Sequence, residues 1–139
     1  MATVIRPEIS SKSKYWIDKH RYYELKHFCL QYSTWKRTYA ALLELSVTSS
    51  LLESSSAGTG HSDLTAKYAT RRALYADRIN LIEQSAKEAD EDLYFYILKA
   101  VTEGLSYTYL KTKLEIPCSR DTYYDRYRRF FWILNASRN

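Results

Sequence analysis

Apolar residues recur at helical spacing over much of the chain, and the pattern is clearest in residues 92–134. On a helix of 3.6 residues per turn, one face of the last part of this stretch is apolar. That face consists of Tyr123, Tyr127, Phe130 and Leu134, with Phe131 at its edge. This spacing predicts a final helix with one side packed on the segments before it.

Two breaks divide the stretch that precedes this final helix. Gly104 predicts a turn after a first helix, and residues 116–118 (Ile-Pro-Cys) predict a second turn after a short one, because proline cannot continue a helix. Ser119 stands where it would cap the final helix, and Asp121 falls in the first turn, where the helix dipole favours a carboxylate. This order of helices and turns predicts a helix-turn-helix.

Polar residues on the rest of the final helix concentrate near its start. They are Arg120, Thr122, Tyr124, Asp125, Arg128 and Arg129. A helix-turn-helix places residues of this kind, at this end of its last helix, in the major groove of DNA. The pattern therefore predicts duplex DNA as the partner.

The first two-thirds of the chain also has helical spacing. A helix is predicted from Tyr15 to about Tyr32, and Ser33-Thr34 leaves open whether one kinked helix or two short ones reach about Leu45. A long helix is predicted from Leu64 to about Lys87, with Asp63 as its N-cap. This long helix offers a surface for a homodimer, and packing on the first helix of its own chain is the alternative.

The predicted fold is all-α, with a helical N-terminal segment and a long middle helix followed by the C-terminal helix-turn-helix. Residues 1–14, rich in Ser and Lys, are predicted to be a flexible basic arm. Residues 15–90 form the helical N-terminal region, interrupted by a Ser/Gly-rich loop over 46–62. Residues 91–139 form the helix-turn-helix region.

Charge is uneven along the chain and supports a phosphate-binding role. The net charge is +5, with eight Lys/Arg against three acids in residues 1–40 and five Arg against two Asp in 119–139. Residues 41–103, by contrast, hold six bases and ten acids. Two basic ends suit a nucleic-acid partner, because Lys and Arg neutralise phosphates.

Three short motifs resemble a known family. They are Val101-Thr102-Glu103-Gly104-Leu105-Ser106-Tyr107, then Ile116-Pro117-Cys118-Ser119-Arg120-Asp121-Thr122-Tyr123-Tyr124, and Arg126-x-Arg128-Arg129-Phe130-Phe131. In this C-terminal part the chain resembles the phage-encoded late transcriptional regulators of the RinA/ArpU type. That resemblance implies a helix-turn-helix similar to region 4 of sigma factors. It also implies DNA-reading positions at Ser119, Arg120, Thr122, Tyr123 or Tyr124, Arg126 and Arg128.

Two residues depart from what DNA reading favours. Asp121 and Asp125 put negative charge into the proposed reading helix. A carboxylate accepts a hydrogen bond from cytosine, but it repels phosphates.

The function expected from these patterns is that of a phage or prophage transcriptional regulator in the cytoplasm of a bacterial host cell. The alternatives are a phage protein that binds and inhibits a host nucleoprotein, and a DNA-packaging protein like the terminase small subunit. Host RNA polymerase or another host protein is a further candidate partner.

Other classes of protein lack support in the sequence. Cys29 and Cys118 stand alone, without a Cys/His cluster, so no metal site is predicted. Without a catalytic triad or a phosphate-binding loop, we expect no enzyme, no catalytic residue and no cofactor. Neither a signal peptide nor an apolar run of membrane-spanning length is seen, so no membrane partner is expected. The acids Glu88, Asp90, Glu91 and Asp92 are interpreted as a solvated helix cap.

Overall fold

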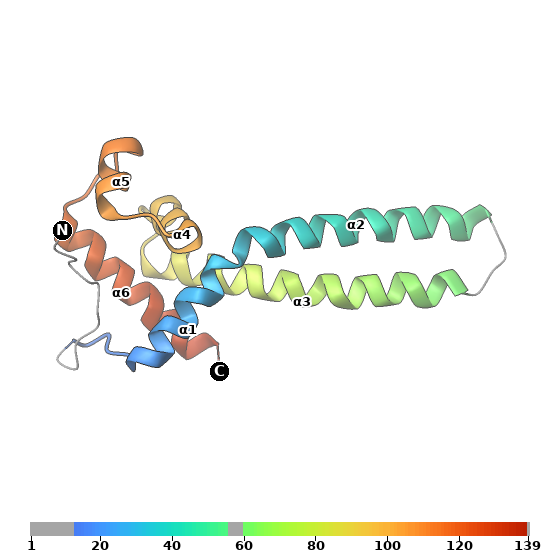
Figure 1. The fold of residues 1–139 in the computed structure, drawn as a ribbon, viewed down its shortest axis with the longest axis horizontal. Coiled ribbons are helices and arrows are strands. Elements are labelled where there is room, and N and C mark those ends of the chain that lie inside the picture. The colour runs from blue at the N-terminus through green and yellow to red at the C-terminus, as the bar shows by residue number, and fades with distance from the viewer. Residues whose placement is uncertain (1–12, 56–59, 139) are drawn as a thin grey trace. The chain divides into compact units, whose positions relative to one another are not determined.

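The fold was determined as a computed structural model that describes residues 13–55 and 60–138. Within these residues the chain is all-helical, which confirms the all-α part of the predicted fold (Figure 1). The helices are α1 (Lys19–Leu30), α2 (Tyr32–Ser55), α3 (Gly60–Ala89), α4 (Tyr94–Glu103), α5 (Tyr107–Lys113) and α6 (Arg120–Ser137). No helix in the described part is both long and apolar enough to cross a membrane.

The chain divides into two compact units. One consists of residues 32–80, and the other of residues 1–31 together with 81–139. This division differs from the predicted boundary at residue 90, because α1 belongs with the C-terminal helices. Residues 1–12, which hold most of the predicted basic arm, lie outside the described residues.

The unit of residues 32–80 is a helical hairpin in which α2 and the first part of α3 lie side by side (Figure 1). The Arg78 guanidinium lies over the Trp35 ring, 5.4 Å from its centroid. Further along, Arg72 donates a hydrogen bond of 2.6 Å to the Ser46 hydroxyl. Leu42 and Ile79 are buried with Trp35. These contacts join the two helices along an antiparallel seam.

The predicted loop over residues 46–62 is wrong for most of its length. Helix α2 continues to Ser55, and α3 already begins at Gly60, so Asp63 lies in the first turn of α3 and is not its N-cap. Ser has only a moderate cost in a helix. Pairing with α3 buries Leu42 and Ser46 on one face of α2, and tertiary packing of this kind overrides the local composition.

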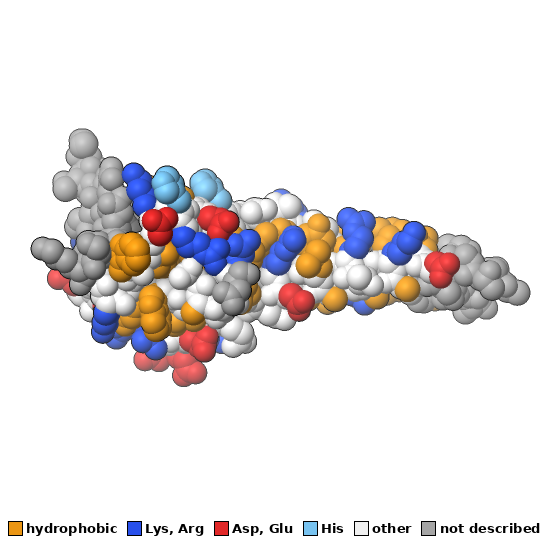
Figure 2. All heavy atoms as spheres, turned by 90° about the horizontal axis from the view of Figure 1, so that it is seen from below, with side chains coloured by type: hydrophobic (Ala, Val, Ile, Leu, Met, Phe, Trp, Pro, Cys, Tyr) orange, Lys and Arg blue, Asp and Glu red, His pale blue; other side chains and the backbone are white. Residues whose placement is uncertain are grey.

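The hairpin exposes many apolar side chains. They are Leu43, Leu45, Val47, Leu51, Leu64 and Leu74. In Figure 2, hydrophobic side chains alternate with basic ones along the exposed surface of these helices. Two helices cover only one side of each other, so a pair alone encloses little core. The homodimer stays a prediction.

The other unit is built around α6. Helix α1 packs on α4 and α6, and α4 also packs on α5 and α6. The predicted apolar face of α6 is buried, and Phe131, placed at its edge from sequence, is fully buried with the rest. These buried residues are Tyr123, Tyr127, Phe130, Phe131 and Leu134.

Two contacts of Tyr22 tie α1 to α6. The Tyr22 and Tyr127 hydroxyls form a buried hydrogen bond of 2.8 Å, although the residues are 105 positions apart. The Tyr22 ring also meets the edge of Phe131, with 5.1 Å between ring centroids. Because these side chains complete the core around α6, α1 folds with the C-terminal helices.

The turn between α4 and α5 needs a residue in the left-handed region. Gly104 has φ +70°, and its N–H donates to the Ala100 carbonyl. A side chain at residue 104 would meet only Leu30, at an ordinary contact distance of 3.7 Å. The cost of an alanine at this turn therefore comes from the backbone.

We expect Gly104→Ala to lower the free energy of unfolding by about 1–2 kcal/mol, the cost of placing an L-residue in the left-handed region. Urea unfolding followed by circular dichroism measures this. Thr108→Ala, at an exposed position of α5, is the control and should stay within about 0.5 kcal/mol. An unchanged unfolding midpoint for Gly104→Ala would contradict the left-handed turn.

Candidate nucleic-acid interface

The start of α6 is organised by Ser119. Its hydroxyl oxygen accepts a hydrogen bond of 3.2 Å from the Thr122 N–H, and the hydroxyl donates to the Thr122 side-chain oxygen at 3.0 Å. This confirms the cap predicted from the sequence. Ser119 therefore has a structural role at the helix start, whether or not it also contacts a partner.

Arg120, the first residue of α6, is exposed and lies against α5. Its guanidinium is 5.1 Å from the ring centroid of Tyr107. The Tyr107 hydroxyl in turn donates a hydrogen bond of 2.7 Å to the Cys118 carbonyl. Stacking on a ring uses the face of a guanidinium and leaves its N–H groups available for hydrogen bonds. Arg120 is thus held in place without being neutralised.

Tyr124 and Arg128 differ in whether their side chains contact other residues of the protein. Both are partly exposed. Tyr124 packs its ring against Tyr107 and Tyr123. Arg128 forms no hydrogen bond or ion pair with any described residue. Its charge is therefore available to a partner.

Arg126 is bound by neighbouring acids. Its Nε donates a hydrogen bond of 2.9 Å to Asp90, and its Nη1 pairs with Asp125. The hydrogen bond to Asp90 is the main reason that the pKa of Arg126 is raised. The charge of Arg126 is therefore paired with two acids of the protein itself.

Arg129 has partners within its own unit. Its Nε donates a long hydrogen bond of 3.4 Å to the Glu88 carbonyl. A hydrogen bond with Arg129 is also the largest cause of the lowered pKa of Tyr15. Arg129 thus connects α6 to the end of α3 and to the segment before α1.

Asp90 joins three parts of the chain. Its Oδ2 receives Arg126 of α6, while its Oδ1 accepts from the N–H groups of Asp92 and Leu93 at 2.9 and 3.1 Å. The interpretation of this acidic stretch as a solvated cap is incomplete. Asp90 does cap the turn before α4, but it is half-buried and ion-paired, whereas its acidic neighbours are exposed.

Tyr123, the alternative to Tyr124 as a reading position, is buried. The other residues proposed for DNA contact, with Arg129 from the same surface of the final helix, fall into two groups. Ser119, Arg126 and Arg129 serve the protein's own structure. The other four keep exposed or partly exposed groups: Arg120, Thr122, Tyr124 and Arg128. Because residues two apart point in different directions on a helix, Arg126 and Arg128 lie on different sides of α6.

Sequence reasoning passed over a second basic group on α5. Lys111 and Lys113 in its last turn are exposed, and Tyr109 beside them is 44% exposed. The sequence feature that could have identified this group is a short helix with two lysines directly before the turn that leads to α6. In a helix-turn-helix the helix preceding the reading helix lies across the DNA backbone, where lysines meet phosphates.

The described part of the chain holds neither a metal-binding cluster nor a cysteine pair. No group of three His, Cys, Asp or Glu side chains there could hold a metal ion. Cys29 and Cys118 are free thiols, and burial raises the pKa of both.

Comparison of this chain with models of protein families, with curated proteins and with solved structures found no match.

We expect Asp90→Ala to destabilise the protein by about 1–3 kcal/mol, because it removes the acceptor for two backbone N–H groups and the partner of Arg126. Asp92→Ala is the matched control, since Asp92 is exposed, and should change the free energy of unfolding by less than about 0.5 kcal/mol. Urea unfolding at neutral pH measures both. Equal effects of the two variants would contradict a structural role for Asp90.

Proposed function

We propose that this protein is a phage or prophage transcriptional regulator that binds duplex DNA through the start of α6. The observation that carries the proposal is that two arginines on this helix remain available to a partner. Arg120 is exposed and stacked on α5, and Arg128 has no intramolecular partner among the described residues. Since α6 packs through its aromatic side, the outer part of its first turns is left for a partner.

The connection between α5 and α6 supports a fixed reading helix. It runs from Leu114 to Ser119, longer than the turn of about 3–4 residues common in helix-turn-helix motifs. Two hydrogen bonds hold it: Ile116 N–H to the Leu110 carbonyl at 3.0 Å, and the Tyr107 hydroxyl to the Cys118 carbonyl. The longer connection therefore still gives α6 a defined direction relative to α5.

Different residues would perform different tasks on DNA. Arg120, Thr122 and Arg128 would contact base edges and nearby phosphates, since an arginine bidentate to guanine contributes about 1–3 kcal/mol of discrimination. Lys111 and Lys113 would neutralise phosphates and so supply affinity without sequence preference.

The two acids on the reading helix have different consequences. Asp125 is paired with Arg126, which reduces its repulsion of phosphates. Asp121 is exposed in the first turn, where it favours the helix but opposes a nearby phosphate. A base edge with an N–H donor, as on cytosine, is the partner that suits Asp121.

We expect Arg120→Ala and Arg128→Ala each to weaken duplex binding by about 5- to 150-fold, the equivalent of about 1–3 kcal/mol per arginine contact. Fluorescence anisotropy with duplexes selected from a random-sequence pool, at two salt concentrations, measures this. Affinity should fall as salt rises, because phosphate contacts release counterions. Arg71→Ala, an exposed arginine of α3 in the part of the chain where acids outnumber bases, is the control and should bind like the parent protein.

No duplex binding at low salt would reject the DNA role. Capture of a host protein, such as RNA polymerase or a nucleoprotein, would then be the next experiment. A ring of many subunits in solution would instead favour a DNA-packaging protein.

Ser119 allows helix capping and DNA contact to be separated. Ser119→Ala should cost about 1 kcal/mol of stability, because the Thr122 N–H loses its acceptor. Ser119→Asp keeps an acceptor and favours the helix dipole, so stability should be retained, but its negative charge should lower DNA affinity. Unfolding and duplex binding of both variants measure this. Parental DNA affinity in Ser119→Asp would place the helix start away from phosphates.

A further inference from the structure

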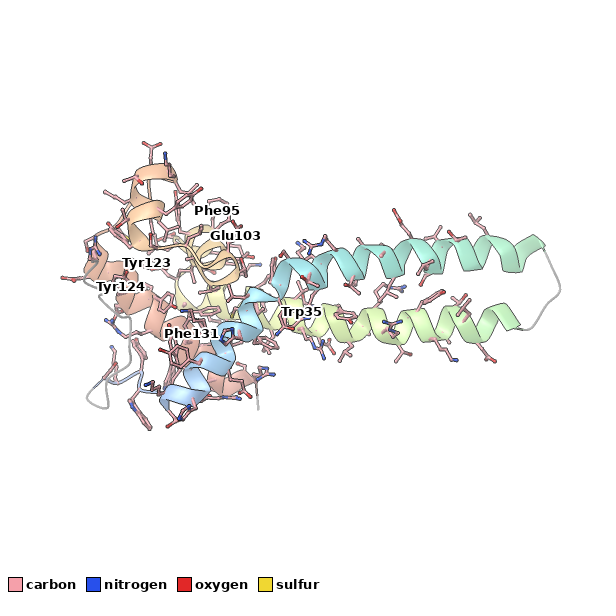
Figure 3. All side chains as sticks on the ribbon, in the orientation of Figure 1. Trp35, Phe95, Glu103, Tyr123, Tyr124 and Phe131 are labelled. Carbon is pink, nitrogen blue, oxygen red and sulfur yellow. The ribbon has the colours of Figure 1, made fainter. Side chains whose placement is uncertain are left out.

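Trp132 is an exposed aromatic residue on the outer side of α6. Its neighbour Phe131 is buried where α6 lies beside α1 (Figure 3), whereas Trp132 is 44% exposed. The Trp132 ring contacts the Tyr15 ring, with 5.8 Å between the centroids and 56° between the planes. A ring that is held at one side and exposed elsewhere offers its free surface to a planar partner.

Tyr15 positions this ring and a neighbouring arginine together. It belongs to the segment before α1 and is itself buried. The Arg129 guanidinium donates a hydrogen bond to the Tyr15 hydroxyl, and this contact is the largest cause of the lowered pKa of Tyr15. Because Trp132 follows Arg129 by three positions, both side chains lie on one face of α6. An exposed ring and a cation are therefore held side by side.

Cations lie on both elements that meet at Trp132. Arg128 and Arg129, four and three positions before it on α6, are partly exposed. Lys14 is exposed, and its ammonium is 5.0 Å from the centroid of the Tyr15 ring, which also contacts Trp132. Lys14 and Arg129 both line an open hollow of about 410 Å³ beside Tyr15. The exposed ring and these cations are named the Trp132 surface, which consists of Lys14, Arg128, Arg129 and Trp132.

The acids next to these cations are already paired. Asp90 and Asp125 also line the hollow, and both bind Arg126. After Asp125 the sequence of α6 holds no further acid. Neither Lys14 nor Arg129 forms an ion pair with a described acid. The Trp132 surface therefore attracts anions.

A single-stranded nucleic acid combines the two features that the Trp132 surface complements. Its phosphates are anions, and its unpaired bases present flat faces that stack on aromatic side chains. In a duplex these faces are covered by the neighbouring bases, so a duplex would meet the cations and leave the Trp132 ring without a stacking partner. An acidic peptide likewise supplies charge but no base.

We propose that the Trp132 surface binds single-stranded nucleic acid. One base would stack on the free side of the Trp132 ring, and the three cations would hold the neighbouring phosphates. Tyr15 is a positioning residue, because it is buried and holds the ring without touching the strand. This inference goes beyond the duplex reading proposed for the start of α6, and Arg128 alone belongs to both surfaces.

The test is a titration of a fluorescently labelled oligothymidylate of about twelve nucleotides with the full-length protein, followed by anisotropy at low salt. An abasic strand of the same length, which keeps the phosphates and lacks the bases, is the matched ligand. The oligothymidylate should bind with a dissociation constant of about 10 μM or lower. It should bind about 5- to 150-fold more tightly than the abasic strand, the contribution of one base stacked on a ring.

Variants separate the ring from the charge. Trp132→Leu should lose the preference for bases, whereas Trp132→Phe keeps a ring and should retain most of it. Lys14→Gln should weaken both strands alike and reduce the slope of log affinity against log salt by about 0.7, the loss of one phosphate contact. Phe95→Leu and Lys67→Gln, at exposed positions outside the Trp132 surface, are the controls and should bind like the parent protein.

Equal affinity of the parent protein for the two strands would overturn the proposal and leave a surface for anions in general. Absence of binding at low salt would also overturn it, as would a parental preference for bases in Trp132→Leu. Because the assay contains no duplex, each of these outcomes is independent of the result for duplex binding.

Discussion

The contact between α1 and α6 is the constraint on which the C-terminal unit depends. Tyr22 contacts two residues on the buried aromatic face of α6, Tyr127 through its hydroxyl and Phe131 through its ring. One turn after Phe131, Asn135 accepts a hydrogen bond of 2.7 Å from Arg21. Without α1, large aromatic side chains of α6 would lose part of their cover and meet water, at a cost of about 1.5–3 kcal/mol for each fully exposed ring. A helix from the start of the chain therefore supports the helix proposed to read DNA.

The features predictable from the sequence were those with local causes. Gly104 marks a turn, Ser119 caps α6, and the aromatic spacing of α6 identifies its buried face; all three are found in the structure. Partners distant in sequence could not be predicted in this way. Nothing in the spacing of α1 indicates that it packs on α6. The serines after Leu45 indicate a loop, although this segment is part of a helix that is stabilised by pairing with α3.

The same limit applies to the candidate site. Helical spacing separates the outer surface of α6 from its core face, but it cannot distinguish an arginine that is free from one already bound. Arg126 is bound to Asp90, 36 positions earlier, and Arg129 to the Glu88 carbonyl. Whether each arginine already has a partner therefore depends on the tertiary fold. Lys111 and Lys113 were overlooked because their proposed role depends on α5 lying beside the start of α6.

The Asp90–Arg126 pair has two opposing effects under the proposed function. It removes one positive charge from the surface that would meet phosphates, which lowers affinity for any duplex. It also joins α6 to the turn before α4, so the side chains of Arg120 and Arg128 start from a helix whose direction is fixed. Reading a base sequence requires donors held in defined positions, whereas attraction to phosphates requires only charge. An arginine used to orient the helix thus favours sequence-selective reading over strong nonspecific binding.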